Sequence, residues 1–292
     1  MKTSLDHLPE DKKNQVLELK NLILKKVPNA DKIILFGSYA SGNWVEDKYT
    51  ENGIQYEYIS DFDVLIVTTS REEKEYVSQD KIVNSWHYHT PVNPIVHTID
   101  YVNEGLENGQ YFFTDIIKDG ILLYDAGAFG FSDPKVLTCE ESKQTATEKF
   151  NKWYKSASRL LKYAKLGFKE SLEEKESLNE VAFLLHQAAE RFYNTTLLVF
   201  TNYKPKVHNL DKLRDLVKPY SKELYFIFSP LPQNEHEVYL FDLLKKGYID
   251  ARYKSEYTIA ASEIYDLIDR IEQMQKIVYE LCSQKVLSIG IE

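Results

Sequence analysis

A pair of aspartates, Asp61 and Asp63, stands at the head of the apolar run Val64–Val67. In a strand, residues i and i+2 point to the same face, so the sequence predicts that these two carboxylates are directed at one point. Hard divalent cations such as Mg²⁺ take oxygen ligands, commonly one or two carboxylates together with phosphate oxygens of a substrate. The pattern therefore predicts a strand whose first residues hold a metal ion.

An earlier apolar run, Ile33–Phe36, ends at Gly37 and Ser38, and small residues follow as far as Gly42. A helix that begins at such a corner presents free N–H groups, which suit a phosphate. Strand, corner and aspartate pair together predict a nucleoside triphosphate site. In that site Gly37 and Ser38 hold phosphates, and the two aspartates hold Mg²⁺.

The ordered set of a strand, Gly37-Ser38, a short helix and Asp61-x-Asp63 resembles the nucleotidyltransferases of the DNA polymerase β superfamily, particularly the small bacterial ones. The resemblance implies a mixed sheet with helices and Mg²⁺ as cofactor. It also implies that Asp61 and Asp63 are catalytic metal ligands. The expected reaction transfers a nucleoside monophosphate from a nucleoside triphosphate to a hydroxyl acceptor, and the sequence identifies neither the acceptor nor the base of the nucleotide.

Two departures from that family pattern stand out. The residues between the two motifs, Asn43–Ile59, are an insert whose alternation around Asn52-Gly53 predicts a β-hairpin. The second departure is on the next strand, Val92–Ile99, where the family pattern has a third carboxylate and this chain has none on the matching face.

By alternation, one face of that next strand carries Asn93, Ile95 and His97, none of them acidic, while Asp100 has the wrong parity. Asn93 is a candidate metal ligand through its amide oxygen, and His97 is a candidate base. Because the third carboxylate is missing, a second interpretation stays open: a nucleotide-binding or regulatory protein with weakened or lost transferase chemistry.

The length of 292 residues suits two domains. A segment with glycine and proline, Ala126–Pro134, is the predicted linker, and strand patterns disappear after it. We therefore predict an α+β protein with a nucleotidyltransferase-like domain at residues 1–130. An up-down bundle of five helices is predicted at residues 131–292.

The second half resembles the HEPN domain, a helical module often found beside or fused to small nucleotidyltransferases. The resemblance rests on three ordered motifs, which are His186-x-Ala188-Ala189-Glu190-Arg191, Pro205-Lys206-x-His208-Asn209-Leu210 and Tyr248-Ile249-x-Ala251-Arg252-Tyr253. It implies that the bundle shapes the acceptor or nucleotide site, with Arg252 as a candidate phosphate contact. Some HEPN ribonucleases have an arginine followed closely by a histidine, and no histidine follows Arg252, so ribonuclease activity is disfavoured.

Charge and composition narrow the partners. A lysine stripe on the helix predicted at residues 140–168 is either a solvated face or a surface for phosphate or a partner. The formal net charge of −9 argues against broad nucleic-acid binding. No run approaches the roughly twenty apolar residues of a membrane span, and no signal region is evident, so the expectation is a cytoplasmic protein without a membrane partner. A homodimer is a possible assembly.

Overall fold

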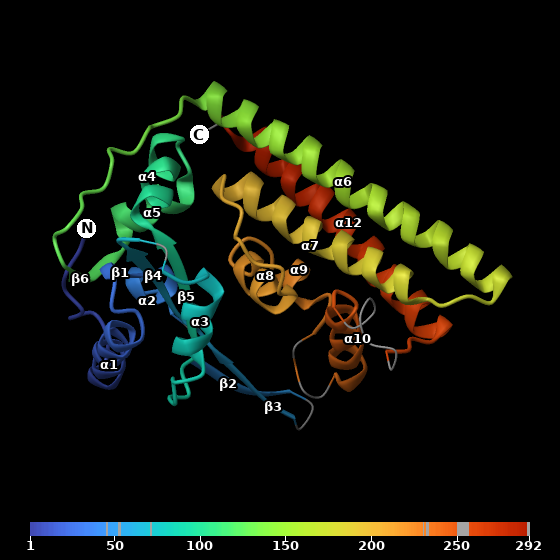
Figure 1. Ribbon diagram of the computed structural model, residues 1–292, viewed down its shortest axis with the longest axis horizontal. Coiled ribbons are helices and arrows are strands. Elements are labelled where there is room, and N and C mark those ends of the chain that lie inside the picture. The colour runs from blue at the N-terminus through green and yellow to red at the C-terminus, as the bar shows by residue number, and fades with distance from the viewer. Residues whose placement is uncertain are drawn as a thin grey trace. The chain divides into compact units, whose positions relative to one another are not determined.

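The computed structural model describes residues 1–44, 46–51, 54–70, 72–229, 231, 234–249 and 257–290. The chain divides into two compact units, Met1–Val136 and Leu137–Glu292 (Figure 1). The first is built on a sheet and the second is helical, so the predicted α+β class is confirmed.

The first unit contains a mixed four-stranded sheet in the order β5-β4-β1-β6. β1 (Ala30–Phe36) lies in the middle and pairs antiparallel with β4 (Phe62–Thr68) and with β6 (Ile121–Asp125), whereas β5 (Val92–Thr98) runs parallel to β4. All seven residues of β1 except Phe36 are buried, as expected for a central strand with both faces covered.

Helices cover both faces of this sheet. On one face, α1 (Glu10–Lys26), the five-residue α2 (Gly37–Ser41) and α3 (Glu75–Val83) share a core with alternate residues of β1 and β4. On the other face, α5 (Tyr111–Asp119) brings Phe112 against Phe36 and Phe113 against His97, and α4 (Ile99–Glu107) packs Tyr101 against the same histidine. The alternation of the strands therefore sends successive side chains to two different cores.

The insert between the two motifs forms the predicted hairpin. β2 (Glu46–Glu51) pairs antiparallel with β3 (Ile54–Ile59), from Glu46 opposite Ile59 to Glu51 opposite Ile54. The predicted turn at Asn52-Gly53 lies outside the described residues.

The segment that follows β6 stays attached to the first unit. The N–H groups of Ala126 and Ala128 donate to the backbone and side-chain oxygens of Asp31, and the N–H of Lys135 donates to the carbonyl of Leu106. These hydrogen bonds continue past residue 130, where the sequence places the domain boundary, and the division between the units falls after Val136.

The helical unit rests on three long helices that pack on one another: α6 (Cys139–Glu174), α7 (Asn179–Thr201) and α12 (Ala261–Ser288). Three shorter helices are α8 (Leu210–Val217), α9 (Lys222–Phe226) and α10 (Glu235–Lys246). The described part of this unit thus has six helices rather than the predicted five, because the short α9 carries too little periodicity to be recognised. In the described part of the chain, none of the helices has the length and apolar character needed to cross a membrane.

A buried ion-pair group ties β1 to the end of β6. Lys32 is 4 % exposed and lies 3.1 Å from Asp31, which is fully buried, and 2.6 Å from the half-exposed Asp125. Although burial opposes it, the hydrogen bonds that Lys32 donates to these two carboxylates raise the pKa of Lys32 and keep it charged.

Because Lys32→Met leaves the Asp31 carboxylate buried without its cation, we expect a loss of about 3–5 kcal/mol in the free energy of unfolding. Urea denaturation of the full chain, followed by circular dichroism, measures the loss. Lys25→Met, at an exposed lysine in the last turn of α1, is the control and should change stability by less than about 0.5 kcal/mol. Equal stability of the two variants would contradict the assigned role of Lys32.

Candidate functional site

The direction of the aspartate pair is set by the phenylalanine between them. Phe62 has no exposed surface, and its ring lies 4.5 Å from the Tyr39 ring and 6.3 Å from the Trp86 ring. Since successive residues of an extended chain alternate in direction, burying Phe62 on the α1–α3 face turns Asp63 to the opposite face, and Asp61 precedes it by two residues. Both aspartates are half-buried.

The predicted Gly37 corner lies directly beside Asp63. In the antiparallel ladder Asp63 is opposite Phe36, and Gly37 follows with φ of +72°. A Cβ at position 37 would collide with the Asp63 carboxylate, at 3.1 Å from its Cγ. Glycine is therefore required here both by the positive φ and by the close approach of the carboxylate. Ser38, the next residue, is the second residue of the short helix α2.

Asn93 lies on the other side of Asp63. The parallel ladder pairs the two residues, and the Asn93 amide Nδ2 donates a hydrogen bond of 2.8 Å to Asp63 Oδ1. Asp63 is thus flanked by Gly37 and Asn93, so three of the predicted site residues come together. Among the described residues, no group of three or more His, Cys, Asp or Glu side chains is close enough to hold a metal ion.

The candidate base His97 is not part of this site. It lies four residues beyond Asn93 on β5, roughly 13 Å along the strand. Its ring is 2 % exposed, packs at 4.4 Å from the Tyr101 ring, and has Nδ1 3.4 Å from Glu75. His97 is thus a core histidine. The remaining candidate, Arg252, lies outside the described residues.

The helical unit brings its motif residues together around one buried carboxylate. Glu190 on α7 lies 3.1 Å from His208 Nδ1 and 3.9 Å from His186 Nε2. The Tyr248 ring stacks between the two imidazoles, 5.0 Å from His186 and 5.5 Å from His208. The i,i+4 spacing predicts the His186–Glu190 pair, but the closer contact to His208 joins residues 18 apart, and no local spacing indicates it.

His186 is neutral in this cluster. Its Nδ1 lies 3.0 Å from the Leu244 carbonyl, so this nitrogen carries the proton. Burial lowers the pKa of His186, and the opposing effects of the Leu244 carbonyl and the Glu190 carboxylate are smaller. In the unfolded chain the same imidazole titrates near its ordinary pKa of about 6.5.

The unfolded state therefore binds a proton on His186 at a higher pH than the folded state does. Stability should fall as the pH drops below about 6.5, with a slope of at most about 1.4 kcal/mol per pH unit from this residue. The control is His186→Asn, because its amide nitrogen can still donate to Leu244 yet does not titrate. Urea denaturation between about pH 7.5 and about pH 5.5, one unit either side of that pKa, should show a shallower decline in the variant than in the wild type, and identical slopes would contradict this account.

Part of the chain matches a known domain family. Residues 150–282 match the family model of the HEPN domain. Among solved structures, a nucleotidyltransferase-like protein from Exiguobacterium sibiricum 255-15 matches with 10% identity and a TM-score of 0.26, covering 94% of this chain and 79% of that one. At that TM-score the likeness carries no argument about fold or activity. No curated protein matches the sequence.

The HEPN match lies within the helical unit, which begins at Leu137, and spans all three motifs from His186 to Tyr253. The resemblance predicted from those motifs is therefore confirmed, and residues 150–282 are assigned to the HEPN domain family.

Proposed function

We propose that the α/β unit binds a Mg²⁺–nucleoside triphosphate at Asp61, Asp63 and the Gly37-Ser38 corner and transfers the nucleoside monophosphate to a hydroxyl acceptor. The observation that supports this most is the position of the Asp63 carboxylate, directly against Gly37 at the head of β4. In this position, one ligand can reach both the carboxylate of Asp63 and the backbone of the corner between β1 and α2.

The residues present fit a magnesium ion. Mg²⁺ is usually held by one or two carboxylates and keeps water or substrate phosphates in its other positions, so the described carboxylates suffice without a cage of three. Asp61 and Asp63 would be its ligands. When bound, Mg²⁺ supplies positive charge that neutralises the triphosphate oxygens.

This chain's own residues then have separate roles. Gly37, having no side chain, lets a phosphate approach the backbone next to Asp63. Asn93 holds the Asp63 carboxylate in place by donating to its Oδ1. With its nitrogen turned to Asp63, the amide of Asn93 serves as a positioning group rather than as the metal ligand that the sequence suggests.

A second candidate function is nucleotide binding without transfer. The observation that favours it is the amide at position 93, directly across from Asp63 in the ladder. An amide does not accept a proton from a hydroxyl acceptor near neutral pH, whereas a carboxylate can do so. Acceptor-dependent release of pyrophosphate from ATP, CTP, GTP or UTP supports transfer, and nucleotide binding without such release supports the second function.

The double substitution Asp61→Asn with Asp63→Asn removes both charged metal ligands. We expect Mg²⁺-dependent nucleotide binding to weaken by more than about 100-fold. Isothermal calorimetry with each nucleoside triphosphate, with and without Mg²⁺, measures this. Asp100→Asn is the control, because Asp100 is an exposed carboxylate in the first turn of α4, at the far end of β5. Undiminished binding by the double variant would refute the site.

Asn93→Asp places a carboxylate where the amide now donates to Asp63. Without Mg²⁺, we expect the lost hydrogen bond and the repulsion to lower stability by about 1–3 kcal/mol. Addition of Mg²⁺ should restore that stability, since the ion neutralises both carboxylates. The measurement is the Mg²⁺-induced change in melting temperature, which should be larger in Asn93→Asp than in the wild type. An equal or smaller change would argue against a metal ion at Asp63.

A further inference from the structure

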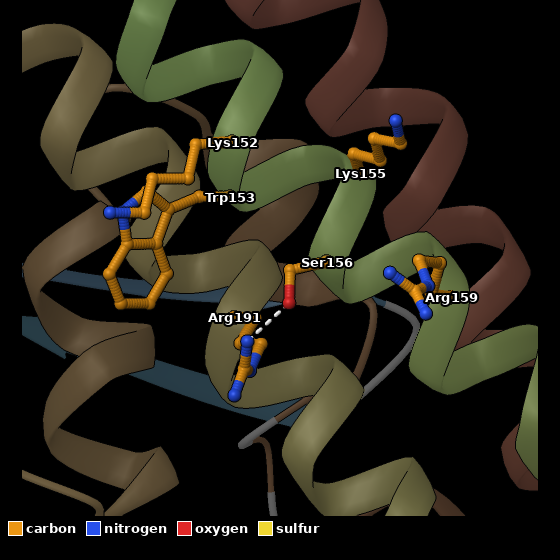
Figure 2. Close-up of a pocket in the computed structure, with 6 residues that line it drawn as sticks. All are labelled: Lys152, Trp153, Lys155, Ser156, Arg159 and Arg191. Atoms are coloured by element: carbon orange, nitrogen blue, oxygen red, sulfur yellow. Dashed lines mark hydrogen bonds between the residues drawn. The ribbon is translucent and has the colours of Figure 1, made fainter.

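A hollow of about 400 Å³ lies in the helical unit between α6 and α7. It is lined by Lys152, Trp153, Lys155, Ser156, Arg159 and Arg191, of which only Arg191 comes from α7 (Figure 2). Its size falls within the usual range for small-molecule sites. Four of the six lining residues are cationic, and none is acidic.

The charge of these four residues is not balanced by ion pairs among the described residues. No carboxylate in the described part of the chain forms an ion pair with Lys152, Lys155, Arg159 or Arg191. Elsewhere in the same unit cations are paired: Lys165 with Glu272, and Arg270 with Glu237 at 2.6 Å. In a chain with a net charge of −9, four unpaired cations around one hollow create a local positive potential that attracts anions.

Both arginines already donate hydrogen bonds to neighbouring side chains. Figure 2 shows Arg191 reaching from α7 toward α6, where its Nη1 donates to Ser156 Oγ. Its guanidinium also lies 5.9 Å from the centre of the Trp153 ring. Arg159 donates from Nη2 to the Tyr163 hydroxyl at 3.2 Å. Because Arg191 is half-buried and bonded across to α6, its guanidinium loses less conformational freedom than an unattached one when it binds an anion.

A further cation, which does not line the hollow, also lies near the Trp153 ring. Lys204, which follows α7, places Nζ 5.7 Å from the centre of the same indole ring. Lys152 and Lys155 are exposed lysines one turn apart on α6. Flexible ammonium groups therefore flank the fixed guanidinium of Arg191, and this combination favours an extended anion over a single small ion.

We propose that this hollow, termed the α6–α7 pocket, binds a small molecule that carries a polyphosphate chain. Linked phosphates present several charges at the spacing of neighbouring side chains, and Arg and Lys are the residues that bind phosphate best. The same chemistry occurs in inorganic polyphosphates and in nucleoside polyphosphates. The site lies wholly within the helical unit and needs neither Mg²⁺ nor the residues at Asp63.

The simpler alternative is that the lysines of α6 form an ordinary solvated face. Lysines on an exposed helix side are common and bind nothing specific. What distinguishes this group is that Arg191 of α7 and Lys204 of the segment after α7 both lie near the ring of Trp153 on α6, whereas a solvated stripe stays on one helix.

The test is isothermal calorimetry of the full chain with sodium tripolyphosphate in buffer containing EDTA. Parallel titrations use ADP, ATP and sulfate, which separate the polyphosphate chain from the nucleoside and from a single divalent anion. We expect tripolyphosphate to bind and sulfate to bind much more weakly. Lys155→Gln with Arg159→Gln should weaken tripolyphosphate binding by about tenfold or more, because it removes two of the four cations.

The matched control is Lys143→Gln with Lys162→Gln, which removes two exposed lysines of the same helix outside the pocket. Its affinity for tripolyphosphate should stay close to that of the wild type. Asp61→Asn with Asp63→Asn should also leave it unchanged, which separates this site from the proposed nucleotide site. Circular dichroism confirms that each variant is folded.

Several outcomes would overturn the proposal. One is the absence of tripolyphosphate binding to the wild type, and another is an equal loss of affinity in the pocket and control variants. Loss of binding in the Asp61 and Asp63 variant would assign the phosphates to the other site. Tighter binding of a single-stranded RNA oligonucleotide through Lys155 and Arg159 would identify a nucleic-acid surface instead of a small-molecule pocket.

Discussion

The arrangement of the first unit depends on the burial of one aromatic ring. Phe62 packs against Tyr39 and Trp86 and is fully buried. Removing a fully buried phenylalanine ring lowers the free energy of unfolding of a protein by about 3–5 kcal/mol. A shift of β4 by one residue would expose that ring and bury the aspartates without partners, so the register is strongly determined. The direction of the carboxylate at Asp63 is therefore a consequence of hydrophobic packing on the opposite face.

How well the sequence predicts the site depends on how far apart in the chain the contacting residues lie. Alternation around Phe62 is local, and so the face of Asp63 follows from the sequence alone. The contact of Asn93 with Asp63 requires knowing that β5 runs parallel beside β4, and no local pattern in the sequence shows that pairing. His97 shares a face with Asn93, but periodicity does not show how far along a strand the site extends.

In the helical unit, spacing along the sequence predicts the helices but not the contacts between residues far apart in the chain. Helical spacing predicts the long helices α6, α7 and α12 because their apolar stripes repeat over many turns. Spacing does not predict which loop residue reaches Glu190, since His208 arrives from a segment 18 residues later. The lysine stripe on α6 is equally visible in sequence, whereas Arg191 becomes part of the same cationic group only when α7 packs against α6.

Net charge and local charge lead to different conclusions for this protein. A value of −9 disfavours long polyanions, because their many phosphates would meet the acidic remainder of the surface. Interactions between exposed charges fade beyond about 8–10 Å at physiological ionic strength, so a compact anion inside the α6–α7 pocket would interact mainly with the four cations that line it. On the proposed account the same surface disfavours an extended nucleic acid and favours a short polyphosphate, so the size of the anion would decide which of the two is retained.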